Sequence, residues 1–212
     1  MSERNDELTV GKRVAGFLER NKLFVVIVLC AAIFLLIGFV CAGTIIAKSS
    51  VKNLTAIDTL TYELTNGSAA LEEEALNAKR AETLEKLTAY TKKSGIVGVR
   101  ANMLAAELSY ETKDLENSVA YWEAAAKKAK NTYVAPLAYY NLGSAYEQLN
   151  KLDEAAQNYK AASEDVEFIL RNHAEFSYAR VLEAQVKTTE AIDAYHNLYA
   201  NYPDDSWGKV AK

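Results

Sequence analysis

Two patterns of hydrophobic and polar residues divide the chain. Between residues 23 and 47 the sequence LFVVIVLCAAIFLLIGFVCAGTIIA contains no charged residue. After residue 50, hydrophobic side chains recur at the three- and four-residue intervals of an amphipathic helix. Only nine Gly and two Pro are present in 212 residues, so few positions interrupt a helix. The predicted fold class is all-α.

The uncharged run at 23–47 predicts one transmembrane helix. At about 1.5 Å per residue such a helix is about 37 Å long, whereas the hydrocarbon core of a bilayer is about 30 Å thick. A cleaved signal peptide is the competing interpretation, but its apolar region is only about 7 to 15 residues long. Both cysteines, Cys30 and Cys41, lie inside the run. Bulky Val40 directly before Cys41 argues against a lipid attachment site there.

Basic residues around this run predict its orientation. Five Lys or Arg residues precede it and only two lie in the twenty residues after it. The positive-inside rule therefore places residues 1–22 in the cytoplasm as a short N-terminal segment. The C-terminal part is then expected outside the cytoplasm, in the periplasm if the cell is bacterial.

The C-terminal part contains an internal repeat. NKLDEAAQNYKAA at 150–162 corresponds to KDLENSVAYWEAA at 113–125, with an offset of 37, and to KTTEAIDAYHNLY at 187–199, with an offset of 36. Another helical stretch precedes each copy. Each unit is therefore predicted to be a helical hairpin, and the hairpins are expected to stack on one another.

The repeat resembles the tetratricopeptide repeat, or TPR. The central copy matches the whole TPR pattern of large, small and aromatic residues, through Tyr139, Leu142, Gly143, Tyr146, Ala155, Tyr159 and Ala162. The third copy ends at Pro203, the residue type that commonly closes a TPR unit. In the first copy Tyr110 is aligned with Tyr146, with the turn shortened by one residue. The resemblance covers residues 98–206.

The segments around the repeats complete the predicted domain plan. Residues 48–97 are expected to form a helical linker with either a degenerate repeat or an N-terminal cap, since 70–95 resembles a lone second helix and 51–66 its partner. The last residues, 207–212, form a short terminal segment that can begin a helix covering the final repeat.

Few residues are available for catalysis or cofactor binding. His173 and His196 are the only histidines, and neither has a second ligand at the spacing of a metal-binding helix. The sequence has no Gly-rich phosphate loop, and no Cys lies beyond the apolar run. We therefore expect no enzyme activity, no cofactor and no metal. A net charge of -4 gives no reason to expect nucleic acid as a partner.

The resemblance implies a groove that binds proteins. In TPR folds the first helices of successive hairpins line a concave surface, and ten residues are expected there from the repeat register: Leu104, Leu108, Glu111, Tyr140, Ser144, Glu147, Gln148, His173, Arg180 and Glu183. Family members that grip a C-terminal carboxylate use Lys and Asn in the groove, and this sequence departs from that pattern. The groove predicted here suits an extended or helical segment of another protein.

The layout of one membrane helix followed by a TPR domain resembles the single-pass ancillary subunit of the bacterial Sec translocon and other periplasmic TPR envelope proteins. That resemblance implies a membrane-tethered binding module of the protein-export or envelope machinery. The alternative is a structural scaffold that self-associates through 51–95 or 203–212, in envelope assembly or division. A homo-oligomer is expected only in the second case.

Overall fold

The computed structural model describes residues 2–212, which fall into two compact units that divide between Val51 and Lys52. The first unit holds α1 (Ser2–Arg20) and the apolar part of α2 (Lys22–Thr65). No break in α2 occurs at residue 48, where the predicted transmembrane segment ends. Within the described residues one helix, α2, is long and apolar enough to cross a membrane, and its apolar window is not buried at all.

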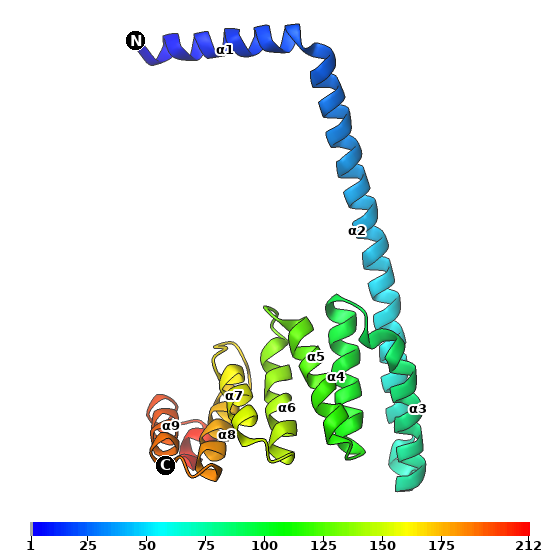
Figure 1. Cartoon of the computed structure of the whole chain (residues 1–212), viewed down its shortest axis with the longest axis vertical. Coiled ribbons are helices and arrows are strands. Elements are labelled where there is room, and N and C mark those ends of the chain that lie inside the picture. Colours follow the sequence, from blue (N-terminus) through cyan, green and yellow to red (C-terminus); the bar gives the residue numbers. More distant parts are fainter. Residues whose placement is uncertain (1) are drawn as a thin grey trace. The chain divides into compact units, whose positions relative to one another are not determined.

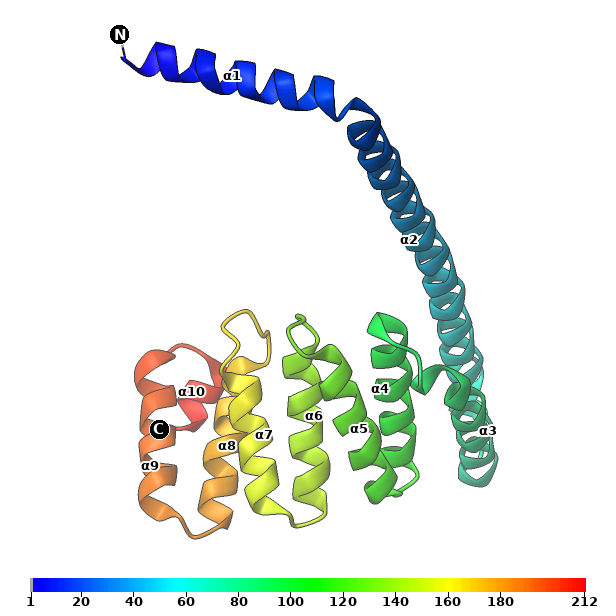
Figure 2. The ribbon, with the colours of Figure 1, turned by 45° about the horizontal axis from the view of Figure 1, so that its top comes forward.

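The second unit is a stack of helices (Figures 1 and 2). It begins with residues 52–65 of α2 and the short 3-10 turn at Ser68–Ala70. The remaining helices are α3 (Glu73–Thr91), α4 (Gly95–Glu111), α5 (Leu115–Ala129), α6 (Ala135–Gln148), α7 (Leu152–Ser163), α8 (Arg171–Ala184), α9 (Thr188–Asn201) and α10 (Ser206–Val210). From α3 onward each helix packs on the next one in the chain, and α10 also packs on α8. The three predicted hairpins are α4 with α5, α6 with α7, and α8 with α9.

Consecutive helices run in opposite directions, so the connections fall on two opposite edges of the unit (Figures 1 and 2). We call one edge the loop edge; it carries the connections 92–94, 130–134, 164–170 and 202–205. The other is the turn edge, formed by the connections inside the hairpins, 112–114, 149–151 and 185–187. The chain enters the second unit at the loop edge, through α2 (Figure 2).

The three turns inside the hairpins share one geometry. Lys113, Asn150 and Val186 have positive φ angles of 65, 56 and 61°. In each turn the N–H of the following residue donates to a carbonyl five residues earlier, at 2.8 to 3.0 Å: Asp114 to Ser109, Lys151 to Tyr146, and Lys187 to Leu182. This hydrogen bond is the C-terminal cap of a helix that ends in a left-handed residue.

These turns correct the alignment of the first repeat. Ser109, not Tyr110, occupies the position of Tyr146, and the turn is not shortened. Ser109 is fully buried, whereas the side chain of Tyr110 is partly exposed. The prediction was wrong because it matched aromatic residues by type and then removed a residue from the turn to keep that match.

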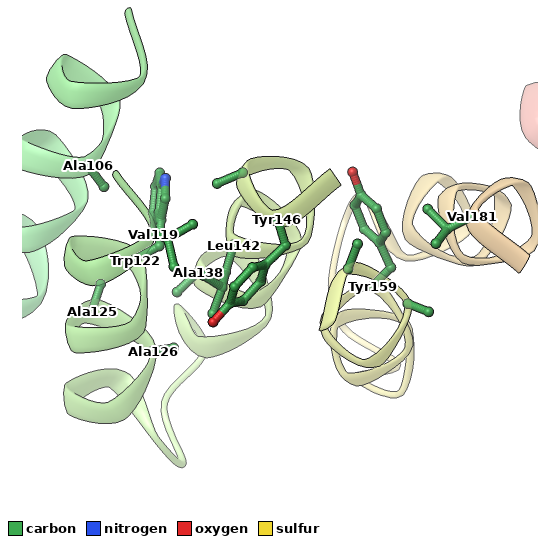
Figure 3. Close-up of a cluster of buried hydrophobic side chains, with 13 residues drawn as sticks. Ala106, Val119, Trp122, Ala125, Ala126, Ala138, Leu142, Tyr146, Tyr159 and Val181 are labelled. Carbon is green, nitrogen blue, oxygen red and sulfur yellow. The ribbon is translucent and has the colours of Figure 1, made fainter. Parts of the chain in front are cut away.

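The core follows the TPR pattern in its central part (Figure 3). Trp122 of α5, Leu142 and Tyr146 of α6, Tyr159 of α7 and Val181 of α8 are all buried in one cluster. Gly143 allows α6 and α7 to approach closely, because a Cβ atom there would lie 2.9 Å from the Tyr159 ring. A second cluster joins Ile57 of α2, Leu87 of α3 and the first half of α4. Residues 52–91 thus cover the N-terminal end of the first hairpin.

Candidate functional site

The candidate site lies on the side of the second unit formed by residues 52–65 of α2 and by α4, α6 and α8. We call it the first-helix face, because these helices open the successive pairs. Along it the character of the surface changes: two small clefts lie on either side of α4, and direct side-chain contacts fill the space between α6 and α8. The two parts are described in turn.

The two clefts share Glu107 of α4 as a lining residue. The cleft toward α2 has a volume of about 200 Å³, and the cleft toward α6 about 220 Å³. The first is lined by Ile57, Thr61, Arg100, Met103, Leu104 and Glu107, and the second by Glu107, Tyr110, Glu111, Trp122, Asn141 and Ser144. Desolvation and, next, the charge of Glu111 raise the pKa of Glu107. The clefts are therefore partly apolar surfaces with a carboxylate between them.

Between α6 and α8 an aromatic cluster surrounds Tyr140. Its hydroxyl lies 2.9 Å from Nδ1 of His173, a hydrogen-bond distance. Its ring centroid is 5.6 Å from that of Tyr159 and 6.3 Å from that of Phe168, in tilted arrangements favoured by aromatic pairs. Tyr140 is thus held from three sides and only partly exposed. Its main role in this structure is to join the second and third hairpins.

A charged contact lies beside this cluster. The two terminal guanidinium nitrogens of Arg180 donate to the carboxylate of Glu147, Nη2 to Oε2 at 2.8 Å, and the Tyr159 hydroxyl donates to the same oxygen at 3.0 Å. Partial burial acts to raise the pKa of Glu147, but the hydrogen bonds and charge of Arg180 outweigh it and lower the pKa overall. The pKa of Arg180 is raised by the hydrogen bonds to Glu147. This geometry is a bidentate Arg–carboxylate ion pair, in which two parallel charge-assisted hydrogen bonds reinforce each other.

The short helix α10 completes the C-terminal end of the face. Trp207 stacks on His173 with ring centroids 3.9 Å apart and an interplanar angle of 7°, and it also contacts Phe176 at 5.2 Å. Asp205 caps the helix by accepting from the N–H of Trp207 at 2.8 Å. Burial, and then the charge of Arg180, lower the pKa of His173. A neutral imidazole at pH 7 suits a ring packed between Tyr140 and Trp207.

The structure places the ten predicted groove residues in different environments. Leu108 is a correction: it is only 2 % exposed and packs in the cluster around Ile57 and Leu87, so it does not reach the groove. The prediction failed because its alignment of the first hairpin was shifted by one residue. With the correct offset Glu107, not Leu108, corresponds to Ser144, and Leu108 lies on the buried side of α4. Leu104, Glu111 and Ser144 line the clefts.

The other predicted residues lie on or beside the contact between the second and third hairpins. Tyr140, Glu147, His173 and Arg180 make that contact, as described above. Glu183 is exposed and accepts from the Tyr195 hydroxyl at 3.1 Å, and Gln148 is exposed. Glu111, which lines the cleft toward α6 in the first hairpin, forms an ion pair with Arg80 of α3 at 2.8 Å.

Sequence reasoning missed most of the residues that line the clefts, among them Glu107, Tyr110 and Asn141, and it also missed Trp207 at the C-terminal end. Glu107 and Tyr110 follow from the central copy once the offset of 37 is kept constant, because they then align with Ser144 and Glu147. Trp207 lies after the last recognised repeat and corresponds to no residue of the repeat pattern. Its only signal was an aromatic residue just beyond Pro203, in a segment too short for a hairpin.

Three comparisons relate the chain to known proteins. No family model matches it. It is 27 % identical over 145 residues to a TPR repeat-containing protein of Treponema pallidum; the match covers 68 % of this chain and 59 % of that relative. The chain thus spans less than two thirds of the relative's length. The similarity supports a TPR protein.

Solved structures agree on the fold. The nearly identical TPR-like repeats described for a kinesin light chain of Podosopora anserina superpose with a TM-score of 0.58, covering 76 % of this chain and 82 % of that one. A single-substitution variant of the same repeats gives 0.59. Sequence identity is 10 % in both cases, so the likeness concerns the fold alone. The chain has a TPR-like, all-helical fold.

Proposed function

We propose that this protein is a membrane-anchored TPR module that binds a segment of another protein on its first-helix face, outside the cytoplasm. It would serve as an accessory of the protein-export or envelope machinery. The observation that carries the binding role is the pair of adjoining clefts around Glu107, which lie side by side across the first helices α2, α4 and α6.

The chemistry of this surface suits a polypeptide ligand. Leu104 and Met103 offer apolar contact area, while Glu107 and Asn141 offer hydrogen-bonding groups on either side of it. A peptide that crosses both clefts can bury apolar side chains and pair its polar groups. An exposed carboxylate at the centre favours a ligand that carries a Lys or Arg at that point. A C-terminal carboxylate would instead be repelled.

The membrane role rests on the apolar segment. Residues 23–47 lie in a helix whose length and composition suit a bilayer, and its large hydrophobic side chains are exposed to solvent in the isolated chain. Exposed apolar surface of that extent needs to be covered, and lipid covers it without a further protein. The excess of basic residues before it favours a cytoplasmic N-terminus.

The test is site-specific photocrosslinking in native membranes. Gln148 at the end of α6 and Arg100, which lines the cleft toward α2, are exposed and accept a benzoylphenylalanine without disturbing the core or removing Glu107. Gln157 on α7 is the matched control, since it is also exposed but belongs to a second helix. We expect adducts with translocon subunits or exported proteins from positions 100 and 148 and not from 157. Equal adducts from all three positions would contradict binding on the first-helix face.

The scaffold hypothesis predicts a different result. If the chain self-associates, the adducts contain two copies of it, and they form from positions on α3 such as Glu82 rather than from position 148. The C-terminal end is less suited to such a contact, because α10 already packs on α8 and α9 there. Crosslinked dimers from α3 alone would replace the binding module by the scaffold.

A further inference from the structure

The loop edge of the second unit carries exposed hydrophobic side chains that no helix pattern requires. Tyr133 is 86 % exposed, Val166 76 % and Ile169 93 %. Tyr133 and Ile169 come from two different connections and line the same open cleft of about 670 Å³. Large side chains exposed to this degree and gathered at one place indicate an interaction surface.

The same edge is strongly basic on the half that begins at α3. Two lysines follow α3 and three more lie at or just beyond the end of α5: Lys92, Lys93, Lys127, Lys128 and Lys130. The Lys128 ammonium donates to the backbone carbonyl of Lys93 at 2.9 Å, so the lysines that follow α3 lie beside those at the end of α5. Acidic residues of this edge belong to the other half: Glu164, Asp165, Glu167, Asp204 and Asp205.

The edge is also the one at which the chain enters the unit. Lys52, the first residue of the second unit, follows the end of the apolar segment at Ala47 by only five residues. Even a fully extended chain of that length spans no more than about 18 Å. If the apolar segment crosses a membrane, the entry point on the loop edge therefore stays close to the headgroups, whatever the direction of the unit.

We propose that the loop edge contacts the surface of an anionic bilayer, with the lysines at the ends of α3 and α5 facing the headgroups and Tyr133 and Ile169 entering the interface. Each Lys near an anionic surface contributes attraction that salt weakens, and Tyr is favoured where hydrocarbon meets water. The contact rests on the membrane anchoring in the proposed function. It would present the second unit in a fixed orientation and leave the turn edge directed away from the bilayer.

The experiment uses the full chain in vesicles, with Cys30 and Cys41 replaced by Ala so that single cysteines can be labelled. Tyr133→Cys and Ile169→Cys carry an environment-sensitive NBD probe on the loop edge. Val186→Cys is the matched control, since Val186 is 82 % exposed and lies on the turn edge. The vesicles are phosphatidylcholine with and without phosphatidylglycerol, and lipids with a nitroxide in the acyl chain quench a probe that reaches the interface.

We expect quenching and a blue shift at positions 133 and 169, several-fold stronger than at 186. Phosphatidylglycerol should strengthen the signal at position 133, which follows the lysines of α5, but not at position 169, which shares its connection with Glu164, Asp165 and Glu167. The triple variant Lys92→Gln, Lys127→Gln, Lys130→Gln should reduce the quenching at position 133 toward the level in pure phosphatidylcholine. It leaves the Lys128 to Lys93 hydrogen bond in place.

Two other outcomes would overturn the proposal in distinguishable ways. Equal quenching at 133, 169 and 186 in a chain that floats with the vesicles and resists alkaline extraction would remove the edge contact but leave the anchor. Release of the chain by alkaline carbonate would remove the anchor, and with it both the proposed membrane role and the edge contact.

Discussion

The space between α6 and α8 and the space on either side of α4 have the same position in the repeat but different contents. Between α6 and α8, Tyr140 contacts His173 and Glu147 pairs with Arg180, so the side chains satisfy one another. Beside α4, Glu107 lines two clefts, and its pKa is raised by desolvation and by Glu111. We call the contact between α6 and α8 the filled junction, because its polar side chains pair with one another. We call the clefts beside α4 the open junction, because a ligand can still make contacts there.

The difference shows that position on the first-helix face does not by itself define a binding residue. His173 and Arg180 were predicted as groove residues and lie on that face, yet their polar groups are engaged with neighbours in the chain. A ligand that uses them must first break those contacts, which costs free energy. A ligand at Glu107 gains contacts without that loss.

The largest expected effect on stability comes from removing Tyr159, which contacts both Tyr140 and Glu147 in the filled junction. Tyr159→Ala deletes a side chain that is 3 % exposed and packs on Tyr140, and it removes a donor to Glu147. We expect the free energy of unfolding to fall by about 3–5 kcal/mol, as for other buried aromatic residues. Urea unfolding of the full chain in detergent, followed by the fluorescence of Trp122 and Trp207, measures it.

Two controls separate the parts of this effect. Tyr159→Phe keeps the ring and should lose only about 1 kcal/mol. Tyr110→Ala at the open junction should lose clearly less than Tyr159→Ala, because Tyr110 is partly exposed. Equal losses for the two Ala variants would contradict the distinction between filled and open junctions.

A smaller effect is expected from the ion pair. A double-mutant cycle of Glu147→Gln and Arg180→Gln should give a coupling free energy of about 0.5–1 kcal/mol, which is the upper range for exposed pairs and is reached here because of the two-pronged geometry. The single contact between Arg80 and Glu111 serves as the comparison and should couple more weakly. A coupling that is no larger at Glu147 than at Glu111 would show that the filled junction is not held by this pair.

Acidification should weaken the filled junction through His173. Its pKa in the folded chain is lowered from the ordinary 6.5, so the unfolded chain binds a proton first. The contribution of His173 to the free energy of unfolding is complete above about pH 6.5 and is lost as the pH falls through the lowered pKa. The contribution of Glu147 is lost only below the ordinary carboxyl pKa of 4.5. Unfolding measured from pH 7.5 to 5 should show the loss. His173→Gln should flatten it, and His196→Gln, the control, should not.

The smallest effect is expected at the open junction. Glu107→Gln should leave the free energy of unfolding at pH 7 unchanged or raise it by up to about 0.5 kcal/mol, because the fold disfavours the charged form. The same variant should weaken crosslinking from position 148 to the bound protein. A clear loss of stability without any change in crosslinking would assign Glu107 to the fold and not to the site.

Much of the fold was predictable because the TPR pattern records close packing. Gly143, Tyr146 and Tyr159 are recognisable in the sequence since each has a steric role, and the offsets of 37 and 36 reappear as the three left-handed turn residues. The site was less predictable. Whether a polar residue such as Arg180 is free or paired depends on which residue the next hairpin brings opposite it, and the repeat pattern does not specify that.

Errors in the first hairpin have a single cause. Ser109 stands where the pattern has an aromatic residue, so matching by residue type moved the alignment to Tyr110. The shifted alignment then assigned Leu108 to the groove, although it is buried. The helix at the C-terminal end was only suggested by the sequence, because five residues carry too little periodicity to define its buried side. Its packing depends on Trp207 meeting His173, a contact between segments far apart in the sequence.

The recurring turn also bears on how this molecule folds. Since the turns at Lys113, Asn150 and Val186 close each hairpin through hydrogen bonds between residues five apart, most contacts form within a hairpin or with its neighbour. Such a chain folds rapidly and opens from its ends, with hairpins separating one after another when a single interface is weak. The last hairpin is held by α10, by the stacked pair of His173 and Trp207 and by the contacts to α6, so opening should begin at the other end, where residues 52–91 would be the first to exchange their amide hydrogens.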